Sequence, residues 1–230
     1  MCRIGAAVTT PCIVITRDRV SYTRLCIASL ERHPDLDIHI VDHGSTWLPM
    51  LAYLDGTRHT VHYQGDRPPR ALWDDRGLLQ RIVGGLGSKP YLVTDPDVVF
   101  DDACPSDWLD QLHEELAVEA PDGGVKVGMG LRLDDLQDTD LSRKIRAWEG
   151  QFWTTRTASG RCWRAPVDTT LALYQGLGVA PDFALGPAAR LDAPYLIRHL
   201  PWYGDLDAAE TAHYRARALP GTSHWINGGW

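Results

Sequence analysis

The sequence predicts an α/β fold whose central sheet is mostly parallel and flanked by helices. Three observations lead to this prediction: short β-branched runs alternate with helical stripes, polar residues follow three of these runs, and no repeat or long linker divides the chain. Such alternation is typical of parallel sheets with right-handed crossovers and helices on both faces. With 230 residues and a hydrophobic content of 44%, the chain is long enough to bury a full core.

The first strands and helices are expected near the start of the chain. Residues 12–16 (CIVIT) form a β-branched run, and apolar residues over 22–30 then repeat at the spacing of a helix. A second strand is expected over residues 38–41 (IHIV) and a third over residues 60–63. Helical spacing over residues 72–86 then returns the chain to the sheet.

A short strand predicted at residues 91–94 (YLVT) ends in two carboxylates, Asp95 and Asp97, with only Pro96 between them. The proline stiffens the backbone on which both carboxylates leave the strand. Two hard oxygen ligands one residue apart suit Mg²⁺ or Mn²⁺, especially when a phosphorylated ligand supplies further oxygens. The same residues also fit an Asp-Pro turn that closes a strand, and this stretch alone leaves both interpretations open.

Polar residues also follow the first two predicted strands. Arg17 comes directly after Thr16, and Asp42 follows the strand at residues 38–41. In open α/β sheets, ligands bind beyond the carboxyl ends of the strands. We therefore expect these three residues to share one rim of the sheet with Asp95 and Asp97, and that rim is the candidate binding site.

The second half of the chain is expected to add further helices and strands. Glycines in the strand predicted at residues 125–133 (VKVGMGLRL) would permit close approach of a substrate, although glycine in a strand more often marks a bulge. The other expected elements are a helix that begins at Pro105 and Ser106, a helix over residues 141–152, strands over residues 166–175 and 195–203, and a C-terminal helix on which Glu210 and Tyr214 could line the site. The tail SHWINGGW could fold over the site or be disordered.

Two carboxylates in this half are candidate general bases. Glu149 borders the apolar face of its predicted helix, and partial burial would raise its pKa, which is useful in a base. The alternative is an edge glutamate paired with Arg146 or Arg156. Asp168 falls inside the strand predicted at residues 166–175, where aspartate is disfavoured. It is either the base on the acceptor side or a residue that caps the start of the strand.

Composition limits the class of partner and the compartment. A net charge of −7 argues against broad binding to nucleic acid or to anionic membranes. No apolar run approaches the roughly 18 residues of a membrane-spanning helix, and the N-terminus lacks the pattern of a signal peptide. The five cysteines are scattered without a C-x-x-C pair, which is typical of a reducing compartment, so we expect a cytoplasmic protein.

The segments IVITRDR, IHIVDHGST and YLVTDPDVVF resemble nucleotide-sugar-dependent glycosyltransferases of the GT-A type, in particular family-2-like members, over roughly residues 12 to 102. The resemblance implies a hexosyltransferase-like enzyme with a GT-A-like fold. It implies that Thr16, Arg17 and Asp42 contact the nucleotide of the donor. It also implies that Asp95 and Asp97, as a D-x-D motif, hold the Mn²⁺ or Mg²⁺ that bridges the donor diphosphate.

The resemblance continues in the segment YLIRHLPWY. Some of these enzymes use a late histidine close to a Pro-Trp pair as the third protein ligand of the metal, and His199 is the match here. Neutral imidazole is a suitable ligand for Mn²⁺, and two aspartates with one histidine leave positions for phosphate oxygens and water. We expect a single domain over residues 1–230, with a nucleotide-sugar half over about 1–105 and an acceptor half over 106–230.

The expected activity is metal-dependent transfer of a sugar from a nucleotide-diphosphate donor to a hydroxyl of a glycan, protein or small-molecule acceptor. Inversion of the anomeric centre would require Glu149 or Asp168 as base, whereas with retention the donor phosphate could serve. One alternative is a phosphohydrolase of the haloacid-dehalogenase type, because DPDVV fits that family's motif with Asp95 as nucleophile and Asp97 as acid/base. Another is a non-catalytic binder of nucleotides or glycans.

Overall fold

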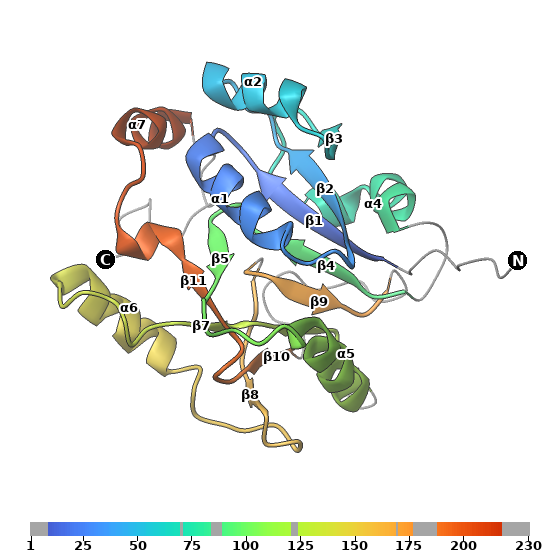
Figure 1. Cartoon of the computed structure of the whole chain (residues 1–230), viewed down its shortest axis with the longest axis vertical. Helices are drawn as coiled ribbons and strands as arrows, with labels where there is room; N and C mark the ends of the chain where they lie inside the picture. The colour runs from blue at the N-terminus through green and yellow to red at the C-terminus, as the bar shows by residue number, and fades with distance from the viewer. Residues whose placement is uncertain are drawn as a thin grey trace, which may run out of the picture.

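Two β-sheets surrounded by helices make up the computed structural model, which describes residues 9–69, 71–83, 89–120, 124–168, 170–176 and 188–217 (Figure 1). The larger sheet has eight strands in the order β3-β2-β1-β4-β9-β6-β10-β8, and the smaller has three in the order β5-β11-β7. Helices pack on both faces of the larger sheet, and four successive strands at one side of it are parallel. The predicted fold class is therefore confirmed.

The parallel side of the sheet contains the strands that the sequence predicts most clearly. β1 pairs in parallel with both β2 and β4, and β3 extends the sheet beyond β2. Thr16 and Asp42 lie side by side at the carboxyl ends of their strands, and Val14 pairs with Thr94. The bounds are Thr10–Thr16 for β1, Leu36–Asp42 for β2, Thr60–Tyr63 for β3 and Tyr91–Thr94 for β4.

The other side of the large sheet is of mixed direction. β9 runs antiparallel to both β4 and β6, β10 runs parallel to β6, and β8 closes the order antiparallel to β10. The bounds are Lys126–Gly128 for β6, Cys162–Arg164 for β8, Ala172–Tyr174 for β9 and Ala188–Leu191 for β10. Strands from both halves of the chain thus belong to one sheet.

The small sheet brings the D-x-D segment to the late histidine. β5 (Val98–Phe100) begins directly after Asp97 and pairs antiparallel with β11 (Leu196–His199), so that His199 lies opposite Val98. β7 (Gly130–Leu131) pairs in parallel with the other edge of β11. After His199 the chain turns into a short 3-10 helix, η2 (Leu200–Tyr203), whose Leu200 N–H donates to the Asp97 carbonyl at 2.8 Å.

The helices cover both faces of the large sheet because alternate residues of its strands are apolar on both sides. Cys12 and Val14 face a cluster that contains residues of α1, α2 and α5, whereas Ile13 and Ile15 face a cluster that contains residues of α3 and α4. The bounds are Val20–Leu30 for α1, Leu48–Gly56 for α2, Ala71–Asp74 for α3, Arg76–Val83 for α4, Trp108–Glu119 for α5, Asp140–Gly150 for α6 and Ala208–Arg217 for α7. Among the described residues, no helix is long and apolar enough to cross a membrane.

Several predicted boundaries are wrong in the second half of the chain. The strand predicted at residues 125–133 is interrupted at Met129, because β6 and β7 belong to different sheets. The strand predicted at residues 166–175 is only Ala172–Tyr174, since Leu171 has a φ of 43° that no strand allows. The strands β5, β8 and β10 were not predicted from the sequence. Some residues of predicted elements lie outside the described residues, namely Thr169, residues 84–88 and the tail SHWINGGW.

The glycines of this interrupted strand allow close packing of the protein against itself. A Cβ on Gly130 would lie 2.5 Å from the Leu191 carbonyl oxygen and 2.6 Å from Leu196 Cδ2, and one on Gly128 would lie 2.6 Å from Val167 Cγ1. The space that could admit a substrate at these two glycines is filled by neighbouring segments. The prediction of a substrate approach at Gly128 and Gly130 is therefore wrong.

We expect Gly130→Ala to lower the free energy of unfolding by about 1–3 kcal/mol, because the added methyl group must displace a backbone carbonyl. Gly150→Ala is the matched control, since nothing lies within 4 Å of a Cβ at the end of α6. Urea denaturation of both variants measures the difference. Equal stability of the two variants would contradict the close packing at Gly130.

Candidate functional site

The carboxyl ends of β1 and β2 lie side by side, where Thr16 pairs with Asp42. Thr16 is buried, and its hydroxyl lies 2.9 Å from the hydroxyl of Thr23 in α1. Asp42 is also buried and accepts hydrogen bonds from the N–H of Gly44 at 3.2 Å and from the Ser45 hydroxyl at 2.5 Å. Burial raises the pKa of Asp42, while these hydrogen bonds oppose the rise. Thr16 and Asp42 are buried, and their hydrogen bonds therefore hold the loops that follow β1 and β2 in place.

Arg17 and Asp18 join these two loops to each other. The Arg17 guanidinium donates to the His43 carbonyl at 3.2 Å and pairs with Asp66 at 2.6 Å. Asp18 is fully buried with a φ of 51°, and its Oδ1 accepts from the N–H groups of Thr46 at 2.5 Å and Trp47 at 2.7 Å. These two N–H groups belong to the residues just before α2, so the Asp18 carboxylate holds the loop that leads into that helix. The rim is thus a preorganised surface.

The C-terminal helix α7 lies against this rim, beside the start of α1 (Figure 1). The Glu210 carboxylate is buried and accepts from the Ser21 N–H at 2.8 Å, which caps the N-terminus of α1. His213 lies 3.0 Å from the Thr46 hydroxyl and 3.6 Å from the Asp18 carboxylate. Glu210 and Tyr214 are both residues of α7. The contacts of this helix therefore place them next to the loops that follow β1 and β2.

Asp97 and His199 lie together at the edge of this rim. His199 Nε2 is 3.5 Å from Asp97 Oδ1, and Arg19 approaches Asp97 Oδ2 at 3.8 Å. Asp97 Oδ1 and His199 Nδ1 are buried, and neither has a hydrogen-bond partner among the described residues. The His199 ring also packs against Trp202, with ring centroids 4.8 Å apart. A buried carboxylate oxygen without a donor is costly, so this position favours a cation.

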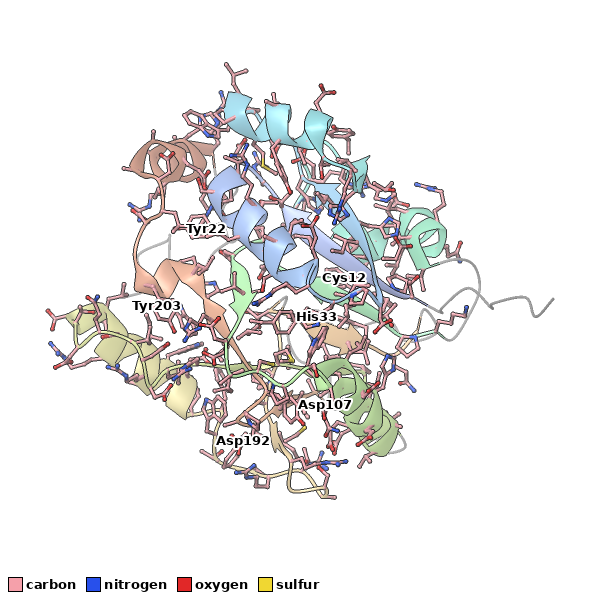
Figure 2. The ribbon with its side chains drawn as sticks, in the orientation of Figure 1. Cys12, Tyr22, His33, Asp107, Asp192 and Tyr203 are labelled. Carbon is pink, nitrogen blue, oxygen red and sulfur yellow. The ribbon has the colours of Figure 1, made fainter. Side chains whose placement is uncertain are left out.

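A network of ion pairs holds the strand that contains His199. Arg198 pairs with Asp101 and with Asp135, each at 2.7 Å, and Arg132 also pairs with Asp101 at 2.5 Å. The hydroxyl of Tyr203 in η2 donates to Asp135 at 2.6 Å, near the start of α6 (Figure 2). The network connects the ends of β5, β7 and β11, and it therefore fixes the backbone on either side of His199.

A divalent cation fits between Asp97 and His199. Metal bonds to carboxylate oxygen and imidazole nitrogen are both about 2.1 Å long, so donors 3.5 Å apart can share one ion. No group of three His, Cys, Asp or Glu side chains that could hold a metal is found among the described residues, which include Asp95, Asp97 and His199. Two side chains that could bind a metal thus converge, and the roles of Asp95, Asp97 and His199 as ligands stay predictions.

Solved structures that are similar to this chain include two enzymes. The mannosyltransferase PcManGT from Pyrobaculum calidifontis in complex with GDP-Man and Mn²⁺ aligns over 93% of this chain and 61% of its own, with 13% identity and a TM-score of 0.47. A 4-diphosphocytidyl-2C-methyl-D-erythritol synthase aligns over 91% of this chain and 98% of its own, with 17% identity and a TM-score of 0.44. The present chain thus spans 61% of the mannosyltransferase's length. No family model and no curated protein sequence matches the chain.

Glu149, the first candidate base, forms a buried ion pair with Arg190 of β10. Arg190 donates to Glu149 Oε2 at 2.6 Å and to the Pro166 carbonyl at 2.8 Å. Burial raises the pKa of Glu149, and Arg190 opposes the rise; the charges of Asp168 and His199 also act on it. The alternative pairing with Arg146 or Arg156 is wrong, because Arg146 donates to backbone carbonyls of the loop before α6 and Arg156 pairs with Asp192.

Asp168, the second candidate base, is exposed and lies in a loop before β9. The prediction that it lies inside a strand is wrong, because the strand begins only at Ala172. Its Oδ1 accepts from the Thr170 N–H at 3.1 Å and from the Thr170 hydroxyl at 2.9 Å, which is the geometry of a side chain that closes a turn. Burial raises the pKa of Tyr174, and the charges of Asp168 and Asp95 add to that rise, so both carboxylates act on the same side chain.

Sequence reasoning missed two arginines of this site, Arg19 and Arg190. The pairing of Arg190 depends on β10, whose sequence AARL has no β-branched residue and becomes a strand only through its neighbours. Arg19 did leave a signal, because Tyr22 follows it at a spacing of three residues at the start of a predicted helix.

Proposed function

We propose that this protein is a nucleotide-sugar-dependent glycosyltransferase that uses a divalent cation, Mn²⁺ or Mg²⁺. The observation that supports this most is the pair of Asp97 and His199, in which a buried carboxylate oxygen without a hydrogen-bond donor lies 3.5 Å from an imidazole nitrogen. Such a mixed donor pair suits Mn²⁺, and a ligand with phosphate oxygens can complete the coordination. The pair lies at the rim where strand ends converge, which is the usual ligand position in open α/β sheets.

In this proposal the chain holds the two ends of the donor separately. Asp97 and His199 hold the cation, and Asp95 is the candidate third ligand. The bound cation would supply positive charge to the diphosphate as it leaves. The loops that contain Arg17 and Asp42 are fixed by their own hydrogen bonds, so they present a rigid surface to the nucleoside.

Of the two candidate bases, Asp168 is the one that an acceptor can reach. Asp168 is exposed, whereas Glu149 is 4% exposed and its Oε2 is bound to Arg190. For an inverting reaction, we propose that Asp168 accepts the proton from the acceptor hydroxyl. Glu149 instead holds α6 against β10 through its ion pair with Arg190. For a retaining reaction the donor phosphate would accept this proton, and neither carboxylate would be required.

A panel of UDP-, GDP-, CMP- and ADP-linked sugars tests the proposal. We expect one donor class to release its nucleotide slowly to water when Mn²⁺ is present, and release to cease when the metal is removed with EDTA. p-Nitrophenyl phosphate is the control substrate, because a phosphohydrolase would cleave it with Asp95 as nucleophile. Cleavage of the phosphomonoester, lost in Asp95→Asn, without turnover of any donor would contradict the proposal.

The assignment of the base has its own test in the same assay. If the anomeric centre inverts, as determined by NMR of the product, Asp168→Asn should lose about 100-fold or more in kcat. Glu149→Gln should then alter stability more than kcat. Loss of turnover in Glu149→Gln with an active Asp168→Asn variant would assign the base to Glu149 instead.

A further inference from the structure

Arg19, the residue before α1, is held between two aromatic rings. Its guanidinium carbon lies 4.0 Å from the ring centroid of Tyr22 and 4.7 Å from that of Tyr214. Tyr22 belongs to α1 and faces the segment that leads into α7, and its hydroxyl contacts the Gly204 carbonyl and the Leu206 N–H at 3.3 Å (Figure 2). Because guanidinium groups stack favourably on aromatic faces, the two tyrosines fix the position of Arg19.

The buried Nε–H of this guanidinium has no hydrogen-bond acceptor from the described part of the protein. The Arg19 side chain is only 13% exposed. The nearest carboxylate oxygen, Asp97 Oδ2, is 3.8 Å from the guanidinium, which is too long for a hydrogen bond. The neighbouring Glu210 carboxylate accepts from the Ser21 N–H through Oε2, and its Oε1 is buried without a partner among the described residues, so Arg19 does not bond to it. A buried donor without an acceptor is costly, so Arg19 is arranged for an acceptor that comes from outside.

The chemistry of that acceptor follows from what lies around Arg19. On one side is Asp97, which shares the candidate cation position with His199. A ligand that reaches both the cation and Arg19 needs several anionic oxygens a few ångströms apart, as in a diphosphate. The planar fork of arginine matches phosphate oxygens with two parallel hydrogen bonds. Arg17 also has a buried Nε without an acceptor among the described residues, but its two terminal nitrogens already donate to Asp66 and to backbone carbonyls. In the described part of the chain, Arg19 has only the long ion pair with the distant Asp97.

We propose that Arg19 is a phosphate-binding residue that grips the diphosphate of the ligand beside the cation, with Tyr22 and Tyr214 as its supports. This inference rests on the proposed function, because it takes the donor's diphosphate as the natural ligand. It also gives α7 a role in binding, since Tyr214 reaches Arg19 from the far end of the chain.

Calorimetric titration with inorganic pyrophosphate tests the inference, because this probe needs neither the right nucleoside nor the right sugar. We expect the full chain to bind pyrophosphate in the presence of Mn²⁺ and Arg19→Met to weaken the binding about tenfold to 100-fold. Arg19→Lys keeps the charge but loses the planar fork, so its affinity for pyrophosphate should lie between that of the unmodified chain and that of Arg19→Met. Tyr214→Ala should weaken binding severalfold, since it removes one support of the guanidinium.

Arg24→Met is the matched control. Arg24 lies in α1, shortly after Arg19, and its guanidinium also lies over a tyrosine, Tyr53 at 5.4 Å, but it is exposed and has no ion pair with Asp97. We expect its pyrophosphate affinity to stay within about twofold of the unmodified chain. Binding by Arg19→Met within twofold of the unmodified chain, an equal loss in Arg24→Met, or no binding by the unmodified chain would each overturn the inference.

The two proposals fail in different ways. Pyrophosphate binding that depends on Arg19, without turnover of any sugar donor, would reject the glycosyltransferase and support the phosphate site. Turnover of a sugar donor with pyrophosphate binding that is independent of Arg19 would support the enzyme and reject the role of Arg19.

Discussion

Asp97→Asn should abolish metal-dependent turnover of the sugar donor, with a loss of about 100-fold or more. The reason is geometric and electrostatic: Asp97 Oδ1 faces His199 Nε2 at 3.5 Å with no hydrogen-bond donor, and an amide at this position supplies neither the negative charge nor an equivalent ligand. Changes to groups that merely orient a metal ligand already cost about 10–100-fold, so the loss of a ligand should cost more. Initial rates at several Mn²⁺ concentrations measure the effect.

Asp102→Asn is the control for Asp97→Asn, because Asp102 is exposed and lies five residues further along the same segment. It should retain the rate and the Mn²⁺ dependence of the unmodified chain. Electron paramagnetic resonance of Mn²⁺ provides a second readout that does not require an acceptor. An Asp97→Asn variant that keeps more than a tenth of the activity, with unchanged Mn²⁺ dependence, would show that the cation does not bind there.

Arg190→Met should lower the free energy of unfolding by about 3–5 kcal/mol at neutral pH. The substitution leaves the Glu149 carboxylate buried without its partner, and removal of one member of a buried ion pair has a cost of this size. The double variant Glu149→Gln/Arg190→Met should recover much of the loss, since it buries no charge. Arg143→Met is the control, on the helix α6 that contains Glu149, because the pairs of Arg143 with Asp138 and Asp140 are exposed and worth about 1 kcal/mol or less.

The pH dependence of Arg190→Met follows from the direction of the Glu149 pKa. Burial already raises this pKa, and loss of Arg190 removes the opposing effect, so the pKa of the folded variant rises further above that of the unfolded chain. Folding then favours the protonated acid, so the contribution of Glu149 to stability is present below the unfolded pKa and is lost as pH rises through the folded pKa. Urea denaturation across pH 4.5–8 should show this fall in Arg190→Met and not in the double variant. Equal stability of Arg190→Met and Arg143→Met would contradict the account.

The sequence was sufficient to predict the parallel side of the fold. Residues 12–16, 38–41 and 91–94 are mostly apolar on both faces, and such runs become strands wherever helices cover both sides of a sheet. The polar residues that follow them mark the rim because parallel strands end at the same edge. For this reason the positions of Thr16, Asp42 and Asp97 at one rim could be inferred from local patterns.

The second half of the chain could not be predicted in the same way, because its structure depends on partners distant in sequence. Leu171 leaves the strand conformation in a segment whose apolar alternation predicts a continuous strand. Glu149 finds its partner 41 residues away in β10, and the carboxylate of Glu210 caps a helix through Ser21, 189 residues earlier. These contacts are set by tertiary packing, which overrides local propensity.

The most direct test of the account is the thermal stability of the chain with UDP, GDP, CMP and ADP, each with and without Mn²⁺, repeated on Asp97→Asn. A ligand that binds only the folded chain stabilises it, by about 2.7 kcal/mol at 100 times its Kd. The account predicts a rise in Tm with one nucleotide that requires Mn²⁺ and disappears in Asp97→Asn. No rise with any nucleotide, or a rise that persists in Asp97→Asn, would contradict a metal-dependent nucleotide site at Asp97 and His199.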